Sequence, residues 1–181
     1  SRRDLAIALA GKETGGTTVA GTSLIAHQTG IQVFATVGIG GVHRNTHFDI
    51  SADLQELSQT PIVVVCAGAK AILDLPNTIE YLETMGVPVL GYRTNEFPAF
   101  YSRSSGLPVG QLVETPEEIA EIALIQWAPG LKAAILVVQP PPEETALPKE
   151  EIEAVIEHAL KDAEAQQIHG PATTPFLLSR V

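Results

Sequence analysis

Residues 62–70 read Ile-Val-Val-Val-Cys-Ala-Gly-Ala-Lys, and this stretch decides the fold. The apolar run 62–65 is typical of a strand that is buried on both faces of a parallel sheet. Residues 71–85 follow with a helical pattern, so Lys70 stands between a buried strand and a helix. Open α/β sheets place their ligand sites at the carboxyl ends of such strands. Lys70 is therefore the first candidate for chemistry, with a solvated lysine at a helix start as the alternative.

Short apolar runs bounded by Gly or Pro alternate with helical patterns along the rest of the chain. This alternation predicts one α/β domain over residues 1–181, with a three-layer α/β/α fold and a mostly parallel or mixed central sheet. Pro98 would suit an edge strand at residues 97–101. The expected strands are 31–36, 62–66, 87–91 and 134–139, and the expected helices are 16–28, 71–85, 115–127 and 149–166.

Composition bounds the class of protein. The chain has 181 residues, of which 45% are hydrophobic, so it can bury one sizeable core. Its net charge of −10 argues against binding a nucleic-acid backbone. Cys66 is the single cysteine and cannot form an internal disulfide. No apolar run is long enough to span a membrane, so we expect a cytoplasmic protein by default, although an organelle address could precede Ser1.

A second stretch rich in chemical groups lies upstream of Lys70. Residues 38–44 read Gly-Ile-Gly-Gly-Val-His-Arg, and residues 48–54 read Phe-Asp-Ile-Ser-Ala-Asp-Leu. The three glycines allow a tight turn and a close approach to a ligand. Their spacing fits neither the dinucleotide fingerprint nor the P-loop. Asp49 and Asp53 are also compatible with helix capping, and His43 with a structural hydrogen bond.

The chain resembles the pseudouridine-5'-phosphate glycosidases, which form the indigoidine synthase A-like family. The resemblance is specific because eight matching blocks occur in order along the chain. It implies an internal portion of a longer catalytic domain, with a general acid glutamate and a phosphate-binding lysine before Ser1 and a site asparagine after Val181. The connector 45–47 is shorter than in the family. The blocks are residues 1–5, 16–20, 38–44, 48–54, 66–74, 86–92, 98–101 and 174–178.

The resemblance also implies a reaction and its residues. Family members cleave pseudouridine 5'-phosphate reversibly to uracil and ribose 5-phosphate, through a Schiff base on the lysine that corresponds to Lys70. A neutral amine of this kind is a competent nucleophile. Asp49 matches the ligand of a Mn2+ cofactor, and a homotrimer is the family's habit. It also implies that Val19, Ser51, Ala52 and Asp53 bind substrate. His43 and Thr36 fall at the strand-to-loop edge of the same site, where they could orient the phosphate or ring hydroxyls, so we add His43 as a catalytic and Thr36 as a substrate-binding candidate.

Two other functions stay open from the residues. A Schiff-base aldolase or lyase acting on a sugar phosphate would use the same strand-end lysine without needing Asp49 to hold a metal. A ligand-binding fragment that keeps the fold without catalysis is the other alternative. In all three cases the expected partner is a small molecule, with neither nucleic acid nor membrane.

Overall fold

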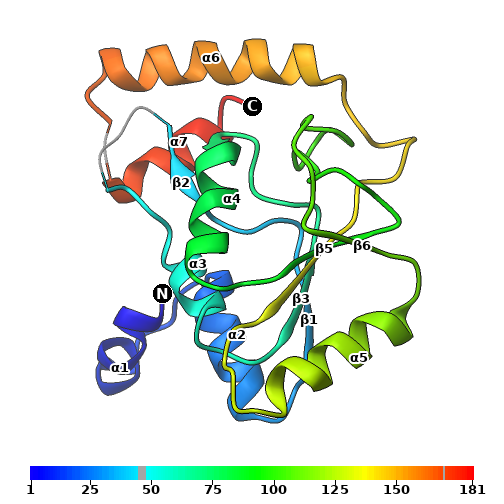
Figure 1. The fold of residues 1–181 in the computed structure, drawn as a ribbon. Helices are drawn as coiled ribbons and strands as arrows, with labels where there is room; N and C mark the ends of the chain where they lie inside the picture. The colour runs from blue at the N-terminus through cyan, green and yellow to red at the C-terminus, as the bar shows by residue number, and fades with distance from the viewer. Residues whose placement is uncertain (45–47, 169) are drawn as a thin grey trace.

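The computed structural model describes residues 1–44, 48–168 and 170–181, which form a layered α/β domain (Figure 1). Its main sheet has five strands in the order β1-β3-β7-β5-β6, and all of its pairings are parallel. A two-stranded antiparallel ribbon lies beyond the carboxyl ends of β1 and β3. The main strands are β1 (Val33–Ala35), β3 (Val63–Cys66), β5 (Val89–Tyr92), β6 (Gln111–Val113) and β7 (Ile135–Val138), and the ribbon is β2 (Val42–His43) with β4 (Leu73–Asp74).

Helices cover both faces of the main sheet. On one face α5 packs against alternate strand residues such as Val63, Leu90 and Ile135, and on the other face α2, α3 and α4 cover the larger core (Figure 1). The predicted three-layer fold with a mostly parallel sheet is therefore confirmed. The helices are α1 (Arg2–Gly11), α2 (Val19–Gln28), α3 (Ala52–Leu57), α4 (Leu75–Thr84), α5 (Pro116–Trp127), α6 (Lys149–Ala165) and α7 (Thr173–Leu178), with a 3-10 turn at Gly170–Ala172.

Side-chain caps fix where four of these helices begin, and at α3 the cap is Ser51, which accepts from the amide of Asp53. Thr18 accepts a hydrogen bond from the amide of Gly21 at the start of α2, and Thr115 accepts one from Glu118 at the start of α5. Asp74 does the same for α4. Each cap satisfies an amide that the helix itself leaves unpaired. The caps on α2 and α4 matter for the site, because α2 begins at the candidate residue Val19 and α4 follows the loop that carries Lys70.

Two local predictions were wrong. The helix expected from residue 71 begins only at Leu75, because β4 and the Asp74 cap come first. Residues 97–101 do not form a strand of the main sheet. They turn over the segment after β3, with Phe100 at φ +62° and its amide donating to the carbonyl of Ala67. The edge strand beyond β5 is β6 instead, and β1 forms the opposite edge.

The core is centred on β7, whose four residues are all buried between β3 and β5. This central position explains the unbroken apolar run at 135–138, since both faces of the strand are covered. Helix α6 lies across one end of the domain, next to α7 (Figure 1). Among the residues that the structure describes, no helix has the length and apolar character needed to cross a membrane.

Candidate active site

Main-chain hydrogen bonds join the glycine-rich loop after β1 to the lysine-bearing loop after β3. The amide of Ile39 donates to the carbonyl of Gly68 (3.0 Å), and the amide of Lys70 donates back to the carbonyl of Ile39 (3.1 Å). Gly68 adopts φ +84°, and a Cβ there would stand 2.2 Å from the carbonyl oxygen of Pro98. Glycine is therefore required at this turn. These two hydrogen bonds and the Gly68 turn place Lys70 beside the glycine-rich loop, at the carboxyl edge of the sheet.

Lys70 lines a pocket of about 560 Å³ at this edge. Thr36 and Gly38 enter it from the end of β1, Ser51 and Asp53 come from the start of α3, and Val19 comes from α2. Five of the eight residues predicted from the sequence thus line one pocket: Lys70, Val19, Thr36, Ser51 and Asp53. Lys70 is the one cation among the described lining residues.

The amino end of α2 faces the same pocket. Thr17, Thr18 and Thr22 line it together with Val19. Val19 is the first residue of the helix, so its amide has no acceptor within the helix, and the helix dipole makes this end favourable for an anion. Hydroxyl groups and an unpaired amide are suitable donors for the oxygens of a phosphorylated sugar.

Asp53 holds the pocket wall together. Its carboxylate is buried, with the residue 4% exposed, and accepts hydrogen bonds from the amides of Ala20 and Gly40, both at 2.8 Å. These amides belong to the first turn of α2 and to the glycine-rich loop. One carboxylate therefore connects α3, α2 and the loop beside Lys70. In this arrangement both carboxylate oxygens are engaged by the protein's own backbone.

The three other predicted residues lie outside the lining of this pocket. His43 is in β2, where its Nε2 lies 3.4 Å from the hydroxyl of Thr174, and Thr174 does line the pocket. Asp49 is half-buried opposite His43, and its carbonyl accepts from the His43 amide (2.9 Å). Ala52 is exposed and lines a different hollow, beside Arg2 and Arg3. The shortened connector 45–47 lies outside the described residues.

The suitability of Asp49 for Mn2+ depends on its donor set. Among the described residues there is no group of three or more His, Cys, Asp and Glu side chains that could enclose a metal ion. A site built from several protein ligands therefore does not fit this part of the chain. A hard cation held by one carboxylate, with water as its remaining ligands, requires no such group and fits Asp49.

Other contributors to the pocket were missed by sequence reasoning. Thr17 and Thr18 stand directly before the apolar run of α2, and this threonine pair was the signal, whereas Thr22 lies one turn inside the helix. Phe100 also lines the pocket, at a turn that was assigned to a strand. Thr174 lies more than 100 residues from Lys70 in the chain, so no local pattern could place it there.

The fold and the pocket define an α/β domain whose lysine stands at the carboxyl edge of a parallel sheet, among hydroxyl groups and a helix amino terminus. The chain belongs to the family described as Indigoidine synthase A like protein, which matches residues 1–181.

Relatives of the chain carry names of enzymes. It is 55% identical over 183 aligned residues to a pseudouridine-5'-phosphate glycosidase of Caldanaerobacter subterraneus subsp. tengcongensis, covering all of this chain and 60% of the relative. It is 57% identical to a protein of the same name from Methylobacterium nodulans, covering all of this chain and 54% of that relative. The chain therefore spans about 60% of the length of the curated relatives that it matches.

Solved structures share the fold. The prealnumycin C-glycosynthase AlnA, crystallised with ribulose 5-phosphate, is 43% identical with a TM-score of 0.93, and the match covers 99% of this chain and 60% of AlnA. An indigoidine synthase A-like protein of Thermotoga maritima is 38% identical with a TM-score of 0.91, and the match covers 99% of this chain and 59% of that protein.

Proposed function

We propose that the full-length protein is a pseudouridine-5'-phosphate glycosidase, which cleaves its substrate reversibly to uracil and ribose 5-phosphate through a Schiff base on Lys70. The observation that carries this proposal is the position of Lys70 in a pocket lined by hydroxyl groups and the amino end of α2. Two further facts support it. Relatives above 50% identity bear this enzyme's name, and the similar protein AlnA is a C-glycosynthase crystallised with a pentulose phosphate.

The chemistry requires an amine because the bond to be broken joins two carbon atoms, C1' of ribose and C5 of uracil. Protonating a leaving heteroatom, as ordinary glycosidases do, cannot break it. The neutral amine of Lys70 attacks C1' and displaces the ring oxygen, which takes a proton. The nitrogen lone pair then forms a C1'=N double bond while C5 of uracil leaves and is protonated. Water hydrolyses the imine to ribose 5-phosphate and restores the lysine.

The remaining pocket residues would bind and orient the substrate. We assign the phosphate to the amino end of α2, where Thr18, Val19 and Thr22 line the pocket. Thr36, Ser51 and Asp53, which line the pocket, would contact the sugar, and Ala52, which lies outside the lining, is not assigned a contact. His43 would act from behind Thr174, orienting the hydroxyl of that residue toward the substrate.

We also propose Asp49 as the ligand of a Mn2+ ion. A bound divalent cation would supply positive charge that offsets the charge of a phosphorylated substrate. Domain extent and assembly are proposals of the same kind: residues 1–181 as one portion of a longer catalytic domain, and a homotrimer. Exposed apolar side chains on the α5 side of the sheet, among them Val33 and Leu124, support an additional protein layer there. Light scattering on the full-length protein measures the assembly directly.

The test of the reaction is covalent trapping. Borohydride reduction with ribose 5-phosphate should attach the sugar to Lys70, within a peptide that also contains Cys66. Lys70→Ala should abolish both trapping and release of uracil, and Lys70→Arg should fail as well because a guanidinium stays protonated. Lys132→Ala is the control, since Lys132 is exposed and distant in sequence. An adduct on Lys12 or Lys132, or full activity in Lys70→Ala, would disprove the mechanism.

The same assay separates the alternative enzyme class. A Schiff-base aldolase would also be trapped on Lys70 but would not release uracil from pseudouridine 5'-phosphate. Trapping without uracil release by the full-length wild-type protein would therefore favour the aldolase. The absence of both would favour a ligand-binding protein.

A further inference from the structure

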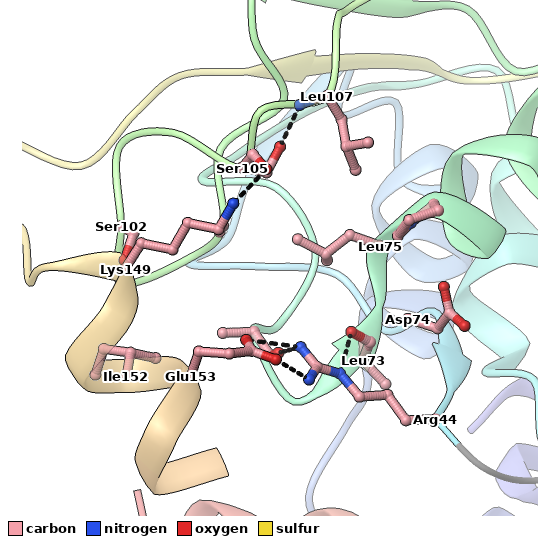
Figure 2. Close-up of a pocket in the computed structure, with 13 residues that line it drawn as sticks. Arg44, Leu73, Asp74, Leu75, Ser102, Ser105, Leu107, Lys149, Ile152 and Glu153 are labelled. Carbon is pink, nitrogen blue, oxygen red and sulfur yellow. Dashed lines mark hydrogen bonds and ion pairs between the residues drawn. The ribbon is translucent and has the colours of Figure 1, made fainter. Parts of the chain in front are cut away.

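Arg44, the residue directly after His43, connects three segments of the domain. Its Nε donates to the carbonyl of Leu73 (3.0 Å) and its Nη2 to the carbonyl of Ala71 (2.8 Å). Its Nη1 and Nη2 also donate to the two carboxylate oxygens of Glu153 in α6, and Nη2 lies 3.1 Å from Oε2 (Figure 2). The Arg44 side chain is 21% exposed. Such a half-buried, two-pronged ion pair is more specific in geometry than an exposed one.

The two carbonyls that accept from Arg44, those of Ala71 and Leu73, belong to the turn that begins at Lys70. The amide of Leu73 donates to the carbonyl of Lys70 (3.0 Å), so Leu73 closes this turn. Leu73 also pairs with His43 across the β2–β4 ribbon. Arg44 therefore holds the far end of the lysine turn against the strand that follows the glycine-rich loop. Glu153 in turn fixes the guanidinium from α6.

The pocket of about 510 Å³ beneath α6 does not compete for these groups. Four charged residues line it, and each is engaged by the protein. Arg44 pairs with Glu153, and Lys149 donates to the carbonyl of Ser105 (2.8 Å) (Figure 2). Asp74 caps α4. The rest of the lining is largely apolar, with Leu75 and Ile152 facing the space. The Arg44–Glu153 pair is thus a structural connection beside an open space rather than a ligand contact.

We propose that Arg44, held by Glu153, is a positioning residue for Lys70, an inference that rests on the proposed Schiff-base function. The attacking amine sits at the end of a flexible stem, so its placement depends on the backbone of the lysine turn. A displacement of about 1 Å at a reacting atom can reduce rate by about 100-fold. A lysine at position 44 could meet the Glu153 carboxylate but could not also fork to two carbonyls. Arg44 therefore acts on kcat through Lys70, without touching the substrate.

The experiment compares Arg44→Lys with Arg2→Lys in the full-length protein. Arg2 is a matched control because it also pairs with a glutamate, with its Nη1 at 3.1 and 3.0 Å from the two oxygens of Glu56, away from the lysine turn. We expect Arg44→Lys to lower kcat by about 10- to 100-fold with KM changed less than threefold. Arg2→Lys should leave kcat within twofold of wild type. Equal kcat in the two variants, or a loss confined to KM, overturns the proposal.

Two further measurements distinguish loss of positioning from loss of folding and from a wrong choice of substrate. Arg44→Ala opens space next to the 510 Å³ pocket, so millimolar guanidinium should restore part of kcat, whereas it should not affect Lys70→Ala. Hydrogen exchange of the Leu73 amide, which needs no activity, should be at least tenfold faster in Arg44→Lys than in Arg2→Lys. Faster exchange supports the role of Arg44 even if uracil release fails in the wild type. Unchanged exchange overturns that role whatever the substrate is.

Discussion

Replacing Asp53 by asparagine tests the connection between the three segments that build the pocket wall. The two shapes are almost identical, but the carboxylate accepts two hydrogen bonds, from the amides of Ala20 and Gly40, each at 2.8 Å. An asparagine side chain has one acceptor oxygen and an NH2 group that only donates. One of the two backbone amides must therefore face another donor. The residue is 4% exposed, so water cannot easily compensate.

The expected loss of stability follows from these contacts. A hydrogen bond to a charged group contributes about 1.5–3 kcal/mol, and leaving a buried donor unpaired costs about 1–3 kcal/mol. These two contributions overlap, so we expect Asp53→Asn to lower the free energy of unfolding by about 2–4 kcal/mol. Urea unfolding at neutral pH, followed by circular dichroism with the m-value checked, measures this difference.

Asp74→Asn is the matched control. Asp74 caps α4 by accepting from the amide of Asn77 (3.0 Å), and asparagine caps helices about as well as aspartate. The second oxygen of Asp74 accepts from the side-chain amide of Asn77 (2.8 Å), but this bond is exposed, so water can replace it. The same substitution should therefore change stability there by less than about 0.5 kcal/mol. A loss below about 1 kcal/mol for Asp53→Asn, or an equal loss in both variants, would refute the assignment of Asp53 as the connecting carboxylate.

Three other outcomes are expected. Asp49→Asn in the full-length enzyme should weaken Mn2+ binding and activity together while the melting temperature stays unchanged; unaltered metal affinity by calorimetry would count against Asp49 as ligand. Gly38→Ala should cost about 1–3 kcal/mol, because a Cβ there would stand 2.4 Å from the ring of Phe100, and chemical denaturation should show a smaller cost in a Phe100→Ala background. Burial raises the pKa of Cys66 to about 12 from an ordinary 9.0. The free energy of unfolding should therefore fall between pH 9 and 12, by up to about 1.4 kcal/mol per pH unit, because the thiol ionises more readily in the unfolded chain. Urea unfolding at alkaline pH in which Cys66→Ala loses stability with pH as steeply as the wild type would contradict this.

The layered fold could be predicted because its strands are buried on both faces and its helices begin at recognisable caps. The run 135–138 and the cap at Thr115 both lie where the sequence indicates. The edge strand beyond β5 was harder to predict from the sequence. Strand β6 reads only Gln-Leu-Val between Gly110 and Glu114, and Gln111 is exposed, so no apolar run indicates it. The stretch around Pro98 is more apolar, but it turns over the lysine loop instead of joining the sheet.

The pocket was predictable where its residues follow strands. Thr36 and Lys70 come after β1 and β3, which are neighbours in a parallel sheet, so their loops had to meet at one edge. The role of Asp53 as a backbone acceptor was not predictable, since both of its partners are main-chain amides without a residue signature. Thr174 reaches the pocket only because α6 returns the chain to this end of the domain.

The position of β7 in the middle of the sheet affects how this protein folds during its synthesis on the ribosome. Strands β1 and β3 can pair early, and β5 and β6 can pair later, but the two pairs have no strand in common. They can join only after residues 135–138 have been made, several seconds after β5 at ordinary rates of synthesis of about 5–20 residues per second. Throughout that interval β3 and β5 each present an open, apolar edge. Nascent chains of this protein are therefore expected to need shielding by chaperones until β7 emerges.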